Sequence, residues 1–182
     1  PVVATNRAKA AALGEYWQGA HERDGGRDHL AYIYVGAGIV AGFVENGSLY
    51  VGSGGAAGEL GHTTVLPDGP PCGCGNRGCL HVLASESAIL RAVRARARQR
   101  PEQELSGSLS MQALGALTMQ RLQEAVAAGD PVVLDVLREA GTWVGIALAN
   151  VINLMNPSLM VIGGSIAELG DPFLDAVRAE IR

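Results

Sequence analysis

The sequence predicts an α/β domain in which a mixed β-sheet carries helices on its faces. Three short strand patterns follow one another between residues 29 and 51, and a short apolar strand at 159–162 lies between helical segments. A meander followed by alternating helix and strand is typical of such a layered domain. With 182 residues, 48% of them hydrophobic and 18% charged, the chain can bury a real core.

The first predicted helix follows the end of a strand. Residues 1–5 predict that strand end, Asn6 is the expected N-cap, and residues 8–18 predict an alanine-rich helix. Its apolar face is expected at Ala10, Leu13, Tyr16 and Trp17. Residues 21–28 are polar, contain two adjacent glycines, and predict a loop.

Three antiparallel strands are expected at residues 29–35, 39–45 and 48–51. A glycine-rich turn at 36–38 joins the first two strands. Asn46-Gly47 joins the second and third, and this pair favours a type I′ turn, which needs positive φ at both central positions. The pattern therefore predicts a meander.

Helices fill most of the remaining chain, after a flexible loop at 52–58. Four are expected behind capping residues or cap-proline pairs: 86–98 after Ser85, 118–129 from Thr118, 132–153 after Asp130-Pro131, and a last one from Asp171-Pro172. Residues 101–110 break the pattern, and 111–117 predict a short helix. The strand at 159–162 is fully apolar, so it is expected to be central and buried.

All three cysteines lie in one stretch, residues 59–80, together with a histidine. His62, Cys72, Cys74 and Cys79 follow one another at spacings of 10, 2 and 5. Three thiolates and one imidazole match the ligand count of a closed tetrahedral zinc site. Alternatives are a disulfide, which would leave one cysteine unpaired, and three buried free thiols. The stretch predicts a zinc-binding loop.

The net charge of −4 and the pI of about 5.5 argue against attraction of the whole chain to nucleic acid. Basic residues gather at Arg91, Arg94, Arg96, Arg98 and Arg100. We expect them on the solvated face and C-terminal end of a helix, with a DNA contact as the alternative. No membrane span or signal peptide is predicted. We expect a cytoplasmic chain that is a piece of a longer protein, cut at both ends.

The stretch around the cysteines resembles the signature of the ROK family, which contains sugar kinases and sugar-responsive transcriptional repressors. Residues 58–62 read GELGH and residues 72–80 read CGCGNRGCL. Further similar segments are 6–15, 36–47 and 156–164. The resemblance implies one actin-like, ribonuclease-H-like lobe of a two-lobed architecture. Residues 1–20 would end the first lobe and connect to the second, and 21–182 would form most of the second lobe, truncated at both ends, with the zinc loop at 59–80.

The same resemblance implies a set of ligand-binding residues: structural zinc on His62, Cys72, Cys74 and Cys79; sugar contacts from Asn6, Glu59, His62 and His81; and nucleotide-proximal glycines at Gly36, Gly38, Gly163 and Gly164. Plainer readings remain open for several of them. Asn6 is a helix cap, Glu59 can be a solvated loop carboxylate, and His81 can be a surface residue. The two glycines after residue 162 can simply end a strand.

Three departures from the family pattern fall where that pattern carries chemistry. Family kinases have an aspartate after the helix-start asparagine, and it takes the proton of the attacking sugar hydroxyl. Arg7 stands there, and a guanidinium cannot accept a proton. Ala37 and Val40 replace a threonine and a glycine of the usual phosphate loop, and His81 replaces a sugar-binding glutamate. We therefore assign no catalytic residue.

These residues favour the sugar-sensing region of a ROK-type transcriptional regulator that has lost kinase activity. The expected effector is a sugar or sugar phosphate, DNA would be bound through an N-terminal domain outside this chain, and the protein is expected to be a homo-oligomer. The alternative is an ATP- and magnesium-dependent sugar kinase of the hexokinase or glucokinase type. A metal-stabilised scaffold without a ligand is a third hypothesis.

Overall fold

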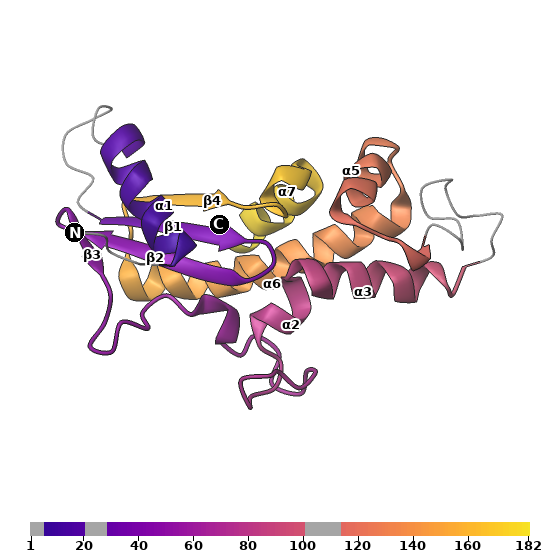
Figure 1. Ribbon diagram of the computed structural model, residues 1–182, viewed down its shortest axis with the longest axis horizontal. Helices are drawn as coiled ribbons and strands as arrows, with labels where there is room; N and C mark the ends of the chain where they lie inside the picture. Colours follow the sequence, from indigo (N-terminus) through magenta and orange to yellow (C-terminus); the bar gives the residue numbers. More distant parts are fainter. Residues whose placement is uncertain (1–5, 21–28, 101–113) are drawn as a thin grey trace.

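The computed structural model describes residues 6–20, 29–100 and 114–182. The predicted strand end at 1–5, the loop at 21–28 and the polar break at 101–110 lie outside the described residues, as do residues 111–113 of the short helix expected at 111–117. Of the rest of that segment, residues 114 and 115 are helical. Figure 1 shows the described elements in chain order, with the strands grouped between helices.

The sheet has the order β3-β2-β1-β4 and is mixed, as predicted. β1 (His29–Val35) pairs antiparallel with β2 (Ile39–Glu45), and β2 pairs antiparallel with β3 (Ser48–Tyr50). β4 (Leu159–Gly163) runs parallel to β1. The hairpin signal is confirmed, because Asn46 and Gly47 have φ of 49° and 76°.

The expectation that the last strand is central and buried was wrong. β4 pairs only with β1, so it lies at the edge of the described sheet. All five of its residues are half-buried. Its apolar run has a different cause from the one predicted: Met160 and Ile162 on one side pack against the main core, while Leu159 packs against a smaller cluster on the other side.

Helix α1 (Arg7–Glu15) continues into a π-helical turn, Tyr16–Ala20, and its buried face agrees with the predicted one only in part. Leu13 and Tyr16 pack against the smaller cluster, as predicted. Ala8, Lys9 and Ala12 are buried, whereas Trp17 is 68% exposed. The reason is close packing on the sheet: a Cβ on Gly42 would lie only 2.4 Å from the Ala8 carbonyl oxygen. Small residues face the sheet because larger ones do not fit there.

All but one of the remaining α-helices begin close to where the capping signals place them. They are α2 (Leu80–Ala84), α3 (Glu86–Ala97), α5 (Met119–Ala127), α6 (Pro131–Met155) and α7 (Asp171–Glu180). The side chains of Ser85, Thr118 and Asp130 cap α3, α5 and α6 as predicted. Two details differ: α2 was not predicted, and the N-cap of α7 is Gly170, not Asp171.

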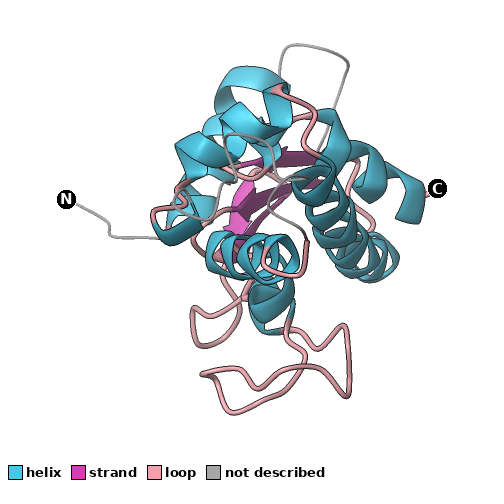
Figure 2. Ribbon diagram, turned by 90° about the vertical axis from the view of Figure 1, so that its right-hand side faces the viewer, coloured by secondary structure: helices cyan, strands magenta, loops and turns pink. Residues whose placement is uncertain are grey.

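Helices cover both faces of the sheet, as Figure 2 shows. Ala31, Ile33 and Val35 of β1 belong to the main core, which includes residues of α3, α5, α6 and α7. Leu30 of the same strand packs on the opposite face, with Ala12 of α1 and Val44 of β2. This alternation along β1 is the two-residue period of a strand between two packed layers.

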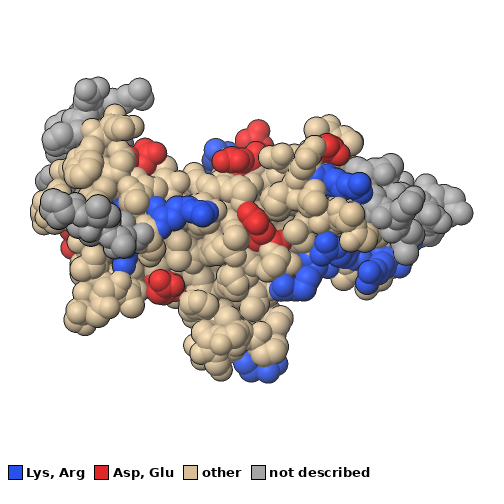
Figure 3. Space-filling model, viewed as in Figure 1, with Lys and Arg blue, Asp and Glu red and all other residues tan. Residues whose placement is uncertain are grey.

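Among the described helices, none combines the length and the apolar character needed to cross a membrane. The arginines of α3 gather on one surface of the molecule (Figure 3). Two of them make internal contacts: Arg94 donates to the carbonyl oxygens of Leu114 and Leu117 at 3.1 and 3.0 Å, and Arg96 pairs with Glu139 of α6. Part of this basic cluster therefore serves helix packing.

Candidate metal centre and adjoining sites

The structure brings together the four predicted metal ligands. The ligand atoms of His62, Cys72, Cys74 and Cys79 all lie within 4.8 Å of one another. His62 Nδ1 is 3.7 Å from Cys72 Sγ, and the sulfurs of Cys74 and Cys79 are 3.6 Å apart. Ligand atoms at zinc bond lengths in a tetrahedron are separated by roughly 3.5–3.8 Å. The donor set and its spacing therefore fit a four-coordinate metal ion.

Backbone pairing positions the two ends of this cluster. His62 ends a short 3₁₀ turn, Leu60–His62, and Cys79 is the N-cap of α2. The Leu80 N–H donates to the Thr63 carbonyl at 3.0 Å, and Thr64 forms an antiparallel bridge with Cys79. The first and last ligands are thus held next to each other by the backbone itself.

Glycines make the turns of the loop between them. A Cβ on Gly78 would lie 1.5 Å from the Leu66 carbonyl oxygen, so only glycine fits there. Gly75 has φ of 97°, and its N–H donates to the Cys72 carbonyl at 3.1 Å. The Cys72 N–H in turn donates to the Asn76 carbonyl at 2.7 Å. These short-range bonds turn the chain so that Cys72, Cys74 and Cys79 face one point.

The three cysteines are free thiols, so the disulfide alternative is not realised. Cys72 and Cys79 are buried and Cys74 is exposed. A hydrogen bond from the Asn76 backbone, together with the neighbouring Cys72 thiol, lowers the pKa of Cys74 to about 7. Burial and the nearby thiols raise the pKa of Cys79 to about 12. A metal ion would supply the positive charge that three clustered thiolates need.

The GELGH segment lies directly against strand β2. The Ala41 N–H donates to the Gly58 carbonyl at 2.7 Å. A Cβ on Gly58 would lie 2.0 Å from the Ala41 carbonyl oxygen, and one on Gly61 would lie 2.6 Å from the Ile39 carbonyl oxygen. The two glycines therefore set the approach of Glu59 and His62 to the sheet. Sequence reasoning missed this role, although the spacing of glycines around Glu59 is a signal for it.

The residues predicted to contact a sugar lie in two places, around the turn that ends at His62 and at the start of α1. The rings of His62 and His81 have centroids 5.9 Å apart, and burial, with the charges of His62 and Arg91, lowers the pKa of His81. Glu59 is exposed and precedes the turn that ends at His62. Asn6 is a helix cap, as predicted: its Oδ1 accepts the Lys9 N–H at 2.9 Å. Sugar contacts by these four residues stay a prediction.

The loop that leads to Glu59 is attached to α1. Lys9 is only 5% exposed, and its Nζ donates to the Gly55 carbonyl oxygen at 2.5 Å. Asn6 and Glu59, which are far apart in the sequence, are thereby connected through the first turn of α1. Sequence reasoning missed Lys9, because lysine side chains are rarely buried.

The glycine turns after β1 and β4 lie side by side. A Cβ on Gly36 would lie 2.9 Å from Ser165 Oγ, and one on Gly164 would lie 2.5 Å from the Val35 carbonyl oxygen. Ser165 donates a hydrogen bond to Glu86, the first residue of α3, and the Glu86 N–H donates to the Gly36 carbonyl at 2.9 Å. Sequence reasoning missed Ser165 and Glu86.

The other two glycines of the predicted nucleotide group differ in their surroundings. A Cβ on Gly163 would lie 2.2 Å from the hydroxyl oxygen of Tyr32, whereas one on Gly38 would meet no atom of the described residues within 4 Å. Gly163 is thus required for packing, while Gly38 leaves one side of its turn open. A nucleotide role for this group stays a prediction.

Arg7, which follows the N-cap residue Asn6, contacts Tyr34 of β1. Its guanidinium carbon lies 4.8 Å from the centroid of the Tyr34 ring, and Nη1 donates to the Tyr34 hydroxyl. Among the described residues, Arg7 forms no ion pair. The position thus carries an oriented positive charge.

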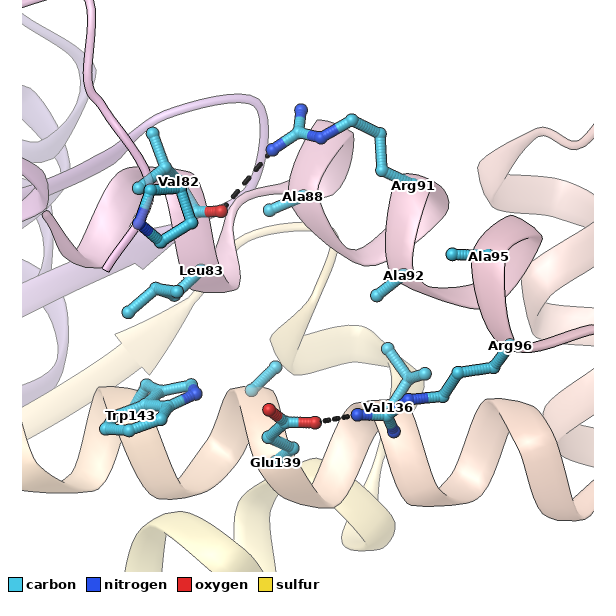
Figure 4. A pocket seen from close by; sticks show the side chains of 12 residues that line it. Val82, Leu83, Ala88, Arg91, Ala92, Ala95, Arg96, Val136, Glu139 and Trp143 are labelled. Atoms are coloured by element: carbon cyan, nitrogen blue, oxygen red, sulfur yellow. Dashed lines mark hydrogen bonds and ion pairs between the residues drawn. The ribbon is translucent and has the colours of Figure 1, made fainter. Parts of the chain in front are cut away.

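A separate hollow of about 330 Å³ lies between α2, α3 and α6 (Figure 4). Val82, Ala92 and Trp143 contribute apolar walls, and the Arg96–Glu139 ion pair lies at one side. No predicted metal, sugar or nucleotide residue lines it. It is therefore distinct from the sites described above.

A mixed sheet between helices, with a His-Cys₃ cluster beside it, defines a lobe of the actin-like sugar-kinase and repressor class. The ROK family model matches residues 1–182, and the chain belongs to the ROK family. The family and fold predicted from the sequence are thus confirmed.

The relatives include both kinases and repressors. The chain is 37% identical over 179 residues to a glucokinase of Halalkalibacterium halodurans, covering 98% of this chain and 53% of that protein. It is 35% identical over 181 residues to a xylose repressor of Caldicellulosiruptor bescii, covering 100% of this chain and 44% of that protein. The chain spans about half the length of the curated relatives it matches.

The similar solved structures also include both a kinase and a transcriptional regulator. A ROK glucokinase from Streptomyces griseus, in complex with glucose and AMPPNP, matches with a TM-score of 0.86 at 36% identity, covering 99% of this chain and 57% of that one. A ROK transcriptional regulator homologous to the E. coli MLC protein matches with a TM-score of 0.82 at 36% identity, covering 96% and 42%. Family membership alone therefore leaves two functions to weigh.

Proposed function

We propose that this chain is the sugar-sensing region of a ROK-type transcriptional regulator that does not phosphorylate its sugar. The observation that carries the proposal is the Arg7–Tyr34 contact. Phosphoryl transfer to a sugar hydroxyl needs a group that accepts the hydroxyl proton. Arg7 occupies the position of that group in the family pattern, and its guanidinium stays protonated.

Neighbouring side chains do not supply a replacement base. Among the described residues, no carboxylate lies within ion-pair distance of Arg7. Glu86 contacts the glycine turn after β1 through its backbone N–H. Its carboxylate already accepts a hydrogen bond from Ser165. Tyr34 accepts from Arg7, so its oxygen is already engaged. These contacts support a binding site without a proton acceptor.

In this proposal the metal is a structural zinc on His62, Cys72, Cys74 and Cys79, which holds the end of the GELGH segment in place. Glu59, His62, His81 and Asn6 would contact sugar hydroxyls. Sensing would work by a shift between two arrangements of the protein, one of which binds the sugar better. The DNA-binding domain upstream, the homo-oligomer, the cytoplasmic location and the division of lobes at residue 20 belong to the same proposal.

A sugar kinase is the second candidate, and the glucokinase matches favour it. The deciding experiment incubates the full-length protein with ATP, magnesium and a panel of sugars and measures ADP release. We expect no sugar-dependent release above the rate without sugar. Sugar-dependent release that is lost in Glu59→Ala would overturn the proposal in favour of the kinase.

A further inference from the structure

The first turn of α1 carries uncompensated positive charge. Arg7 and Lys9 both lie in it, and the turn contains no acidic residue. The N-terminal end of a helix adds a partial positive charge of its own. Among the described residues, neither Arg7 nor Lys9 forms an ion pair. The local potential at this end of the helix is therefore positive, although the whole chain has a net charge of −4.

Tyr34 fixes the direction of this charge. The guanidinium of Arg7 lies over the ring of Tyr34 at 4.8 Å and donates one hydrogen bond to its hydroxyl. Arg7 is otherwise exposed, and within the described part of the chain this is its one side-chain hydrogen bond. Most of its N–H donors remain free, and a planar guanidinium offers them in the geometry that binds a phosphate with two parallel bonds.

The same tyrosine connects Arg7 to the glycine turns. A Cβ on Gly36 would lie 2.6 Å from the Tyr34 hydroxyl oxygen, and one on Gly164 would lie 3.0 Å from its Cε2 atom. The hydroxyl that accepts from Arg7 is thus also the Tyr34 atom closest to Gly36, and an edge of the same ring lies against Gly164. Gly38, in the first of these turns, has open space where a Cβ would be. A positive charge and an uncrowded backbone thus occupy one end of the site.

We propose that the effector is a phosphorylated sugar, with Arg7 binding its phosphate. The inference rests on the proposed function above and names the class of ligand. In a kinase of this family, the base faces the hydroxyl that receives the phosphate, so a carboxylate there suits a neutral sugar. The guanidinium of Arg7 reverses that charge, and it favours a sugar on which the same position already carries a phosphate monoester.

The test is isothermal titration calorimetry of the full-length protein with glucose, mannose and their 6-phosphates. ATP and inorganic phosphate are titrated as control ligands, because each carries phosphate without being a sugar 6-phosphate. We expect a 6-phosphate to bind about ten- to hundredfold more tightly than its parent sugar, the range of a charge-assisted hydrogen-bond pair. Arg7→Gln should remove this preference, Arg7→Lys should retain part of it, and Arg138→Gln, an exposed arginine of α6, should leave it unchanged.

Each other outcome is informative. Equal affinity for a sugar and its 6-phosphate, or a preference that survives in Arg7→Gln, would overturn this inference and leave sugar sensing intact. Arg7-dependent binding of ATP or inorganic phosphate without preference for a sugar phosphate would also overturn it. Sugar-dependent ADP release from ATP would instead overturn the proposed function itself. Tyr34→Phe gives a further check, because loss of the hydroxyl should weaken the phosphate preference without removing the ring.

Discussion

The guanidinium carbon of Arg7 lies 4.8 Å from the centroid of the Tyr34 ring, and the same guanidinium donates to the Tyr34 hydroxyl. The two residues are 27 positions apart, and their contact joins the start of α1 to the end of β1. A charge that is stacked and hydrogen-bonded in this way is held in place. The contact therefore gives the positive charge of Arg7 a defined position beside the sheet.

A double-mutant cycle measures how strongly Arg7 and Tyr34 interact. We expect Arg7→Ala and Tyr34→Leu to show a coupling free energy of about 0.5–1 kcal/mol in urea unfolding, the range of an exposed cation–π pair. Additive effects of the two substitutions would contradict the contact. Arg138→Ala combined with Tyr34→Leu is the matched control and should be additive, because Arg138 pairs with Asp135 on α6.

Metal content tests the cluster directly. Elemental analysis should find about one zinc per chain, and Cys74→Ser should lose it, because a closed structural site needs all four ligands. Since the binding energy of a structural metal contributes to folding, a chelator should lower the melting temperature of the wild type. Asp68→Asn, at an exposed residue of the same loop, should keep the metal. Full metal content in Cys74→Ser would exclude that cysteine as a ligand.

Two glycines of the loop before the metal ligands should differ sharply in their tolerance of a side chain. Gly58→Ala places a Cβ 2.0 Å from the Ala41 carbonyl oxygen at a φ of 93°, so we expect a loss of at least about 1 kcal/mol in the free energy of unfolding. Gly54→Ala meets no atom within 4 Å in the part of the chain that the structure describes, and it should change stability by less than about 0.5 kcal/mol. Equal stabilities of the two variants in urea would show that the segment does not lie against β2.

The cap of α6 is a buried carboxylate. Asp130 is 3% exposed, and its Oδ1 accepts the N–H groups of Val132 and Val133 at 2.9 and 3.2 Å. Asp130→Ala should cost about 1–2 kcal/mol, the upper part of the range for helix N-caps. Asp135→Ala, at an exposed residue of the same helix, should cost at most about 1 kcal/mol, because it breaks only a surface ion pair. A thermal unfolding series of the two variants decides between these values.

What the sequence predicted well was local chemistry. The four metal ligands lie within eighteen residues of one another, from His62 to Cys79, and glycine turns bring such close ligands together without distant contacts. Caps such as Asp130 were equally predictable, because a cap acts on the residues that follow it. The family signature then implied the fold, and the structure agrees with it.

What the sequence did not predict depends on distant partners. The buried face of α1 follows from the absence of a side chain at Gly42, which no helical period reveals. Helix α2 has only five residues, too few for a periodic pattern. The position of β4 at the sheet edge and the contact between Arg7 and Tyr34 both depend on segments that are far apart in the sequence. Only the folded chain therefore shows them.

The bond from the Glu86 N–H to the Gly36 carbonyl has a mechanical consequence. It attaches the first residue of α3 to the turn after β1, and Ser165 attaches the same residue to the turn after β4. Eleven residues later the helix ends, about 17 Å away, just beyond the point where Arg96 pairs with Glu139 of α6. Helix α3 therefore connects the two glycine turns at its start with α6, the longest helix of the described chain, near its end.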